Sequence, residues 1–329
     1  MSWRTQQRRD IRSASHAGDW YSDNGKELGT QLSTWLGKVA PTGATFPIQG
    51  CKAIIAPHAG YAYSGQAAAW AYKCIDTTQI KRVFILGPSH HFYLDGCALS
   101  TCREYETPLG NLPLDLETIE ELKATGKFET MDISADEAEH SIEMHLPYIR
   151  KVFEGKEIKI VPIVVGAISP SSELVAGAVL APYLEKEDTL FVISSDFCHW
   201  GSRFSYTFYY PEPAPSKAAP VNLSRSVAPS PSHPVHLSIR RLDHEAMDFL
   251  TMPPSDAQST HSQFSSYLSE TKNTICGRHP IGVLLGVLAT LEKEKGVSAV
   301  LKFVRYEQSS ACVSVRDSSV SYASAYVKF

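Results

Sequence analysis

Short apolar runs alternate with amphipathic segments along most of the chain. The apolar runs occupy 51–56, 82–87, 158–165, 189–194, 297–304 and 322–329. Between them, apolar residues recur at helical spacing over 26–39, 114–125, 172–185, 237–250 and 280–295. Runs such as V-F-I-L and L-F-V-I lack the alternation of a half-exposed strand, which is typical of strands covered on both faces. The pattern predicts α/β/α layers around a mostly parallel, mixed central sheet.

A proline- and serine-rich stretch at about 211–236 interrupts this pattern. Seven of the 20 prolines fall there, and such a segment has little to bury and few backbone donors for a sheet. The length of the chain would allow two domains with a linker at this point. The motifs described below lie on both sides of the stretch and must share one crevice. We therefore predict a single domain over 1–329 with a flexible insertion at about 211–236.

Composition and charge narrow the function classes. The 329-residue chain is 43% hydrophobic and has a formal net charge of −4, so it can form a sizeable core. A mildly acidic chain without a long Lys/Arg block argues against nucleic acid or an anionic membrane as the main partner. The longest apolar run, 281–291, is far shorter than the roughly 20 residues that span a bilayer.

The N-terminal segment and the cysteines bear on localisation. The arginines near the start lie in a segment with no apolar stretch, so we expect a solvated tail rather than a secretory signal or a transit peptide. They are Arg4, Arg8, Arg9 and Arg12. Seven scattered cysteines indicate reduced thiols. The expected location is the cytoplasm, with the nucleus as a second candidate.

Three of the predicted strands are followed at once by a motif that contains histidine. These motifs are A-P-H-A-G-Y with His58, G-P-S-H-H with His90 and His91, and S-D-F-C-H-W with Asp196 and His199. The carboxyl ends of parallel strands share one edge, where α/β proteins bind ligands. We therefore expect all three motifs to line one crevice.

Cys276 is a further candidate, because it lies in N-T-I-C-G-R-H-P just before a helix with Pro280 in its first turn. The helix N-terminus and the neighbouring Arg278 would favour its thiolate. Two imidazoles with a thiolate, or with a carboxylate such as Asp196, suit iron, copper or zinc. Spacing alone does not decide whether Cys276 or Asp196 is the third ligand. No P-loop, dinucleotide fingerprint, G-x-S-x-G elbow or C-x-x-C pair competes with this interpretation.

The segment E-H-S-I-E-M-H-L-P-Y (139–148) is less informative. His140 and His145 lie about 140° apart around a helix, so they cannot bind one ion from the same helical face. Glu143 and His145 could line a pocket or make structural hydrogen bonds. No role is assigned to His233, His236, His244 and His261.

Taken together, these motifs resemble those of the MEMO family. They are S-H-A-G-D-W-Y (15–21), A-P-H-A-G-Y, F-I-L-G-P-S-H-H, D-E-A-E-H-S-I-E-M-H-L-P-Y, S-S-D-F-C-H-W-G, N-T-I-C-G-R-H-P-I-G-V-L-L and D-S-S-V-S-Y-A (317–323), in the family's order. The resemblance implies the fold of class III extradiol ring-cleaving dioxygenases, with a metal crevice. The stretch at 211–236 is extra relative to the family pattern.

The resemblance also implies roles for individual residues. His58 and His90 match the two imidazole ligands, and Cys276 stands where the dioxygenases have a carboxylate ligand. His199 matches their catalytic base, with Asp196 beside it. The residues expected in a substrate or peptide pocket are Trp20, Tyr63, His91, Glu143, His145 and Arg278.

Three functions follow from the resemblance. The first is binding of one iron or copper ion, with zinc as a further candidate, in redox signalling and control of cell motility and growth. The second is a non-catalytic adaptor that binds phosphotyrosine peptides or signalling proteins in the crevice, with donors from His90, His199 and Arg278. The third is a working dioxygenase that acts on an unknown catechol. A soft thiolate in place of a carboxylate argues against ordinary ring cleavage.

Overall fold

The computed structural model describes residues 10–40, 43 and 45–329. Among these residues, the central sheet has nine strands in the order β10–β14–β2–β9–β3–β8–β4–β7, with β13 paired to β14. The middle of the sheet is parallel and almost fully buried, which confirms the predicted mostly parallel sheet covered on both faces. Its strands are β2 (Cys51–Ala56), β9 (Thr189–Ser194), β3 (Arg82–Pro88) and β8 (Lys159–Val165).

Antiparallel strands complete both edges of this sheet. β14 (Ser319–Lys328) pairs with β2, with β13 (Val300–Gln308) and with β10 (His199–Trp200). At the other edge, β4 (Cys97–Leu99) is antiparallel to β8 and is followed by β7 (Phe128–Thr130). One small sheet contains β1 (Ile11–Arg12), β5 (Glu104–Tyr105) and β6 (Leu112–Pro113). A second consists of β11 (Phe208–Tyr209) and β12 (Val221–Asn222). Strands of two or three residues are too short to show a periodic pattern in the sequence.

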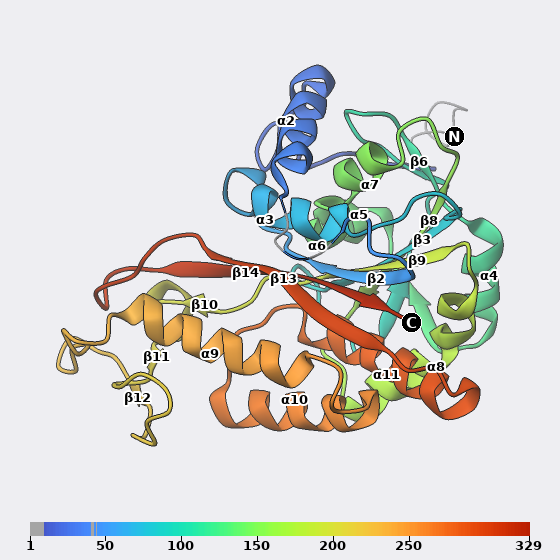
Figure 1. The fold of residues 1–329 in the computed structure, drawn as a ribbon. Helices are drawn as coiled ribbons and strands as arrows, with labels where there is room; N and C mark the ends of the chain where they lie inside the picture. Colours follow the sequence, from blue (N-terminus) through green and yellow to red (C-terminus); the bar gives the residue numbers. More distant parts are fainter. Residues whose placement is uncertain (1–9, 41–42, 44) are drawn as a thin grey trace.

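Helices cover both faces of the sheet (Figure 1). One face carries α2 (Gly25–Lys38), α3 (Tyr61–Lys73), α5 (Ile133–Ala138), α6 (His140–Glu143) and α7 (Leu146–Val152). The other carries α8 (Pro170–Glu185) and α11 (Arg278–Lys295), with α10 (Ala257–Thr271) packed on α11 and α9 (Val235–Leu250) beside α10 and β13. α4 (Leu116–Ala124) lies beside β7, and a 3-10 turn (Ser202–Phe204) follows β10. The layers are therefore those that the sequence predicts.

The five predicted helices all form, with ends within two residues of the expected ones. The sequence did not predict α3 or α10. α3 is rich in alanine and buried over most of its surface, whereas α10 is rich in serine, and several of its buried positions are polar, such as Thr260 and His261. In α3 small residues extend around the helix, and in α10 polar residues share the buried face with Phe264 and Tyr267, so the apolar stripe of an amphipathic helix is weak in both sequences.

The proline-rich stretch lies outside the central sheet. Strands that precede it and strands that follow it join that one sheet. The stretch also makes specific contacts with the body: β12 pairs with β11, and Leu223 is buried. Arg241 of α9 donates hydrogen bonds to the backbone oxygens of Glu212 and Ser216. The end of the predicted insertion belongs to α9, which begins at Val235.

Arg12 departs from its expected place in a solvated tail. It belongs to β1 and is fully buried. Its guanidinium pairs with Asp136 at 3.1 Å and with Glu143 at 2.7 Å. The expectation is therefore wrong at Arg12, because two buried carboxylates hold the side chain inside. Arg4, Arg8 and Arg9 lie outside the described residues.

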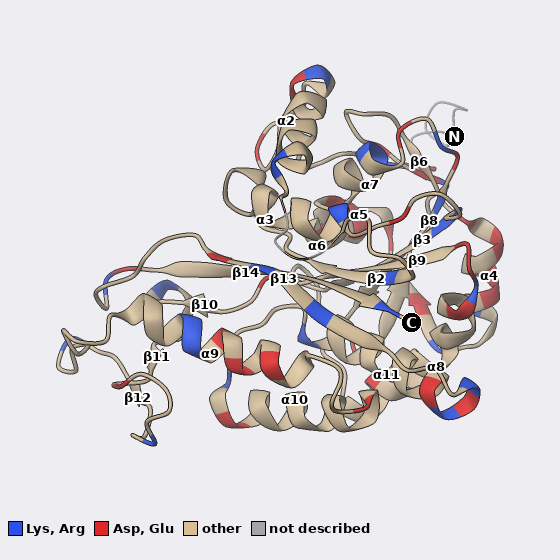
Figure 2. Ribbon diagram, in the orientation of Figure 1, with Lys and Arg blue, Asp and Glu red and all other residues tan. Residues whose placement is uncertain are grey.

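Charged side chains of both signs are mixed along the helices, for example on α4 and α9 (Figure 2). Among the described residues, no helix has the length and apolar character needed to cross a membrane.

Candidate metal centre

The ends of neighbouring parallel strands bring the predicted motifs together. β2, β9 and β3 are adjacent in the sheet and run in the same direction. Their carboxyl ends lead into the loops of His58, Asp196 and His90. The rings of His58 and His90 lie 5.2 Å apart, centre to centre. The strand-end motifs therefore meet at one edge of the sheet, as expected for a ligand site in an α/β fold.

A third histidine joins this pair. Donor atoms of His58, His90 and His140 all lie within 4.8 Å of one another. His140 is the first residue of α6, and its ring stacks on His90 with 4.4 Å between centres and 23° between planes. The spacing of His140 and His145 excludes one ion on a single helical face but does not predict a partner for His140, so the sequence gives His140 no role. Its place beside His90 depends on the fold of the segment that precedes α6.

Hydrogen bonds fix the tautomer of His58. The hydroxyl of Ser194 donates to the carbonyl oxygen of Ser141 at 2.7 Å, which uses its only proton. Ser194 must therefore accept the 2.6 Å hydrogen bond from Nδ1 of His58. His58 carries its proton on Nδ1, so Nε2 has no proton and its lone pair faces Sγ of Cys276 at 3.2 Å. An imidazole in this state is ready to bind a metal ion.

Glu139 orients His90 in a similar way. Its carboxylate is buried, lies 3.0 Å from Nδ1 of His90 and accepts the backbone N–H of His90 at 2.6 Å. Burial alone would raise the pKa of Glu139, but hydrogen bonding and the charge of His90 outweigh it and lower the pKa to about 2. The ionised carboxylate accepts a hydrogen bond from Nδ1–H of His90. Nε2 of His90 therefore has no proton, and its lone pair is available to a metal ion.

Burial keeps the imidazoles of His58 and His140 neutral. It lowers the pKa of His58 well below its ordinary value, and neighbouring histidines add to the effect. Burial, followed by the charge of His90, lowers the pKa of His140 to about 3, although Glu139 acts in the opposite direction. A metal ion binds the neutral imidazole, so no proton has to be displaced from these two side chains at neutral pH.

Cys276 approaches the same group from the loop before α11. Its Sγ lies 3.2 Å from Nε2 of His58 and accepts the backbone N–H of Asp196 at 3.3 Å. Burial raises the pKa of this thiol well above its ordinary value, and the charge of Asp196 adds to the rise. This corrects the expectation that Arg278 and the helix N-terminus favour the thiolate. Arg278 lines a different cavity, beside Glu173 and His261.

His199 and Asp196 lie in the same crevice. Nδ1 of His199 faces two carbonyl oxygens, of Phe197 at 2.9 Å and Thr274 at 3.1 Å, so it carries a proton. Nε2 of His199 is thereby left able to accept a proton. Asp196 accepts the backbone N–H of His58 at 2.9 Å, and burial raises the pKa of its carboxyl group. The two side chains can thus hold or move a proton next to the histidine cluster.

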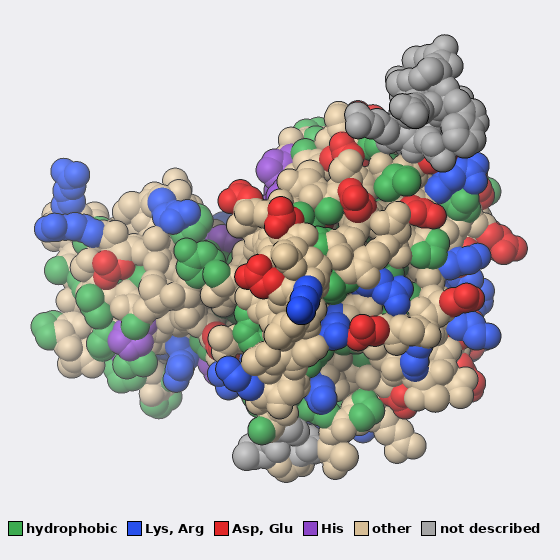
Figure 3. Space-filling view, turned by 90° about the horizontal axis from the view of Figure 1, so that it is seen from above, with side chains coloured by type: hydrophobic (Ala, Val, Ile, Leu, Met, Phe, Trp, Pro, Cys, Tyr) green, Lys and Arg blue, Asp and Glu red, His purple; other side chains and the backbone are tan. Residues whose placement is uncertain are grey.

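A crevice of about 550 Å³ opens over the cluster. It includes the aromatic side chains of Trp20 and Tyr63, as the resemblance implied. Its wall also contains Arg203 and Phe204 and a set of hydroxyl groups from the two ends of the loop that connects β13 to β14, Ser309, Ser310, Ser318 and Ser319. Seen from above, histidines lie around the hollow between the main body and a smaller lobe (Figure 3). The cavity therefore has aromatic, hydroxyl and cationic walls.

The other expected pocket residues lie elsewhere. Glu143 is buried in hydrogen bonds with Arg12 and Tyr21, and the buried His145 shares a 2.8 Å hydrogen bond with Tyr72. His91 is exposed and contacts His140 from outside, with 3.3 Å between ring nitrogens. Together with the displaced Arg278, these positions correct the predicted pocket. The sequence offered no signal for them, because local spacing does not show which way a side chain in a short helix points.

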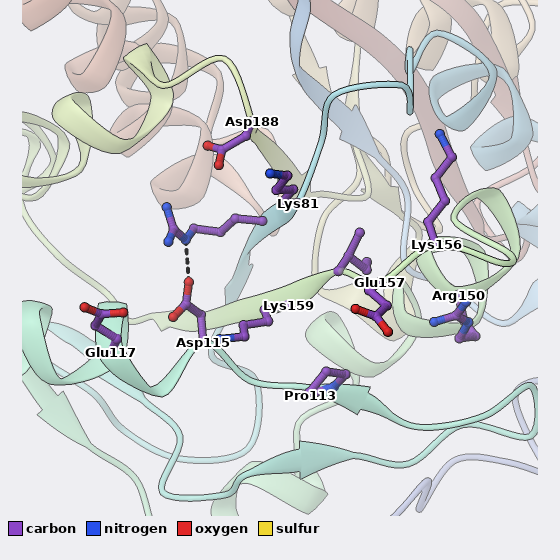
Figure 4. A pocket seen from close by; sticks show the side chains of 11 residues that line it. Lys81, Pro113, Asp115, Glu117, Arg150, Lys156, Glu157, Lys159 and Asp188 are labelled. Atoms are coloured by element: carbon purple, nitrogen blue, oxygen red, sulfur yellow. Dashed lines mark hydrogen bonds and ion pairs between the residues drawn. The ribbon is translucent and has the colours of Figure 1, made fainter.

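A larger cavity, about 780 Å³, lies near the amino ends of the parallel strands β3 and β8. Its wall mixes cations and carboxylates near the starts of β3 and β8, including Lys81, Lys159 and Glu157 (Figure 4). Arg82 and Asp115 pair across it at 2.5 Å. The charges there largely offset one another, and no histidine or cysteine lines it. The smaller crevice is therefore the stronger candidate site.

Fold and site together define an α/β protein with a histidine cluster at the carboxyl edge of parallel strands. The model of the Memo-like protein family matches residues 12–326. Protein MEMO1 of Xenopus laevis is 47% identical over 314 residues, covering 95% of each chain, and Protein MEMO1 of Homo sapiens is 45% identical with the same coverage. This chain belongs to the Memo family. A crystal structure of an uncharacterized Escherichia coli K12 protein is 13% identical, with a TM-score of 0.46 over 82% of this chain and 98% of that one.

Proposed function

We propose that this protein binds one redox-active transition metal ion, iron or copper, through His58, His90 and Cys276. The observation that carries the proposal is the approach of donor atoms from separate elements at one sheet edge. His58 and His90 belong to a set of imidazoles whose donor atoms lie within 4.8 Å of one another, and Sγ of Cys276 lies 3.2 Å from Nε2 of His58. The residues fit such an ion, because neutral imidazoles and a thiol are ligands for iron, copper and zinc. When bound, the ion would supply electron transfer or activation of a bound oxygen donor.

The remaining residues of the crevice would support this chemistry. Nε2 of His199 would accept a proton from a bound molecule, and Asp196 would hold the loop of His58 through its backbone hydrogen bond. Glu139 and Ser194 would keep both imidazoles in the tautomer that binds metal. In the cell, we propose a role in redox signalling and in the control of motility and growth, as the family resemblance suggested.

Metal content tests this proposal. The protein should be purified without added metal and analysed by mass spectrometry of its elements, then titrated anaerobically with Cu(I) and Fe(II). We expect about one ion per chain in the wild type and almost none in the His58→Ala/His90→Ala double variant. A His236→Ala/His244→Ala variant, altered outside the crevice, is the matched control. Wild-type metal content in the first double variant would show that the ion is not held here.

A second function is supported by the wall of the crevice. Tyr63 is 64% exposed, and Trp20 and Arg203 lie in the same wall, which suits a ligand with an aromatic ring and an anionic group. This is the adaptor hypothesis, with Arg203 in the place that the sequence assigned to Arg278. Titration with a phosphotyrosine peptide and its unphosphorylated form tests it. Equal, weak binding of both peptides would contradict it.

A further inference from the structure

A second group of histidines lies among helices α8, α10 and α11, which pack together on one side of the sheet (Figure 1). At its centre, the carboxylate of Glu173 lies 2.7 Å from Nε2 of His261 and 2.7 Å from Nδ1 of His279. The side chains of Glu173 and His261 are buried, and that of His279 is 17% exposed. Gly282 of α11 leaves room for the carboxylate, because a Cβ there would meet it. None of these residues takes part in the proposed metal centre.

The carboxylate of Glu173 fixes the protons of both imidazoles. Burial alone would raise the pKa of Glu173, but the hydrogen bonds and charges of His261 and His279 outweigh it and lower the pKa. An ionised carboxylate can only accept hydrogen bonds, so His261 carries a proton on Nε2 and His279 carries one on Nδ1. Nε2 of a neutral His279 therefore has a lone pair, and it is the nitrogen of that ring that remains for a ligand.

A cavity of about 210 Å³ opens over this group, and Arg278, Ser265 and Ser269 lie in its wall with His279. Arg278 is exposed, and its guanidinium makes no hydrogen bond or ion pair with residues 10–40, 43 and 45–329. The serines of α10 divide into two kinds. Those outside the cavity, at 262 and 266, donate their hydroxyl protons to backbone oxygens four residues earlier. The hydroxyls of Ser265 and Ser269 make no such bond within the described chain, so they can donate to a ligand.

These groups together select a ligand that carries both a negative charge and a proton. A guanidinium and hydroxyl donors suit an oxyanion, whereas the lone pair of Nε2 of His279 needs a ligand that can donate a proton. Hydrogen phosphate has both features near neutral pH, and sulfate has only the charge. A phosphate monoester loses its last proton near pH 6. Bicarbonate has only three oxygens for the four groups of the wall. The cavity is several times larger than the roughly 30 Å³ of one water molecule, so a phosphate ion fits.

We propose that this cavity binds inorganic phosphate in the form of hydrogen phosphate. Arg278 pairs with the charged oxygens, the hydroxyls of Ser265 and Ser269 donate to the remaining ones, and Nε2 of His279 accepts the P–O–H proton. Glu173 is a positioning residue, because it holds His279 in the tautomer that accepts this proton. The site goes beyond the proposed function and does not depend on a metal ion.

Calorimetric titration of the metal-free, full-length protein tests the site. Inorganic phosphate, sulfate, bicarbonate and methyl phosphate are compared at about pH 8, where an ordinary imidazole is neutral. Arg278→Met keeps the apolar stem and removes the guanidinium. His279→Asn places an amide nitrogen close to the position of Nδ1, so it keeps a donor for Glu173 and removes the acceptor Nε2. Circular dichroism checks that both variants are folded.

Three further variants serve as controls. Arg240→Met and His244→Asn alter exposed side chains of α9, outside the cavity. Arg203→Met removes the cation of the other crevice, which is the rival place for an anion. All three should bind phosphate as the wild type does.

We expect the wild type to bind phosphate at least about tenfold more tightly than the other three anions, because a hydrogen bond that involves a charged group is worth about a factor of ten or more. Arg278→Met should weaken phosphate binding by at least about tenfold. His279→Asn should remove the preference for phosphate over sulfate. Equal binding of phosphate and sulfate by the wild type, no detectable phosphate binding, or loss of binding in Arg203→Met instead of Arg278→Met would each overturn the proposal.

Discussion

Oε1 of Glu139 lies 3.0 Å from Nδ1 of His90, while Oε2 of the same carboxylate accepts the backbone N–H of that histidine. The buried side chain of Glu139 thus fixes the positions of both the ring and the backbone of His90, a proposed metal ligand. The N–H of Ser141 also donates to Glu139, which ties the start of α6 to the same carboxylate. The rigidity of the site therefore depends on a residue that would not itself bind the ion.

Glu139→Gln should weaken metal binding by about 10–100-fold, because an amide is a weaker acceptor for the Nδ1 proton of His90 and can offer it an N–H instead. The measurement is a dissociation constant from chelator competition. Glu137→Gln, two residues earlier and partly exposed, is the matched control and should bind as the wild type does. If Glu139→Gln binds equally tightly, Glu139 does not position His90.

Arg12→Met should destabilise the fold by about 3–5 kcal/mol, because it leaves the carboxylates of Asp136 and Glu143 buried without their cation. Urea unfolding followed by circular dichroism measures the change in the free energy of unfolding. In the control, Arg103→Met removes a largely exposed pair with Asp10 at 3.9 Å and should cost less than about 1 kcal/mol. Similar losses in the two variants would contradict the buried network.

Stability should fall in acid partly because of His145. Burial lowers the pKa of His145 to about 3, against an ordinary value of 6.5. Below pH 6.5, His145 becomes protonated in the unfolded chain but stays neutral in the folded protein. The contribution of His145 to the free energy of unfolding is therefore fully present above pH 6.5 and is lost as the pH falls toward 3. The slope for one such proton is about 1.4 kcal/mol per pH unit.

The metal-free His145→Phe variant should therefore lose stability less steeply than the wild type between pH 6 and 4, even if its stability at pH 7 is lower. Urea unfolding at several pH values measures both slopes. His244→Phe, at an exposed position, should keep the slope of the wild type. Parallel pH profiles for His145→Phe and the wild type would show that His145 is not kept neutral by the fold.

Gly282→Ala should cost about 1–3 kcal/mol, because its new Cβ would meet the carboxylate of Glu173. Glu173 cannot move away freely, since His261 and His279 each hold one of its oxygens at 2.7 Å. Thermal and urea unfolding measure the loss. Gly37→Ala is the control: it lies in α2 with open space around it, and it should be neutral or stabilising by up to about 1 kcal/mol. A neutral Gly282→Ala would mean that α8 and α11 tolerate a wider spacing.

The sequence by itself determined the layers, the parallel middle of the sheet and the meeting of His58, His90 and Asp196. The physical reason is that buried strands need continuous apolar runs, and that parallel strands put their following loops at one edge. These features depend on local pattern and on a rule of topology. The motifs around them also carried the family resemblance, which the comparisons confirmed.

Only the tertiary structure decided which other side chains join the site. His140 and His145 lie in one short motif, yet His140 faces His90 and His145 faces Tyr72. Arg278 follows Cys276 by two residues but points into another cavity, and Arg12 is drawn inside by distant carboxylates. Each of these outcomes depends on partners far away in the chain, and on the cost of burying a charge without one. Local spacing contains no information about such partners, so they become known only once the chain has folded.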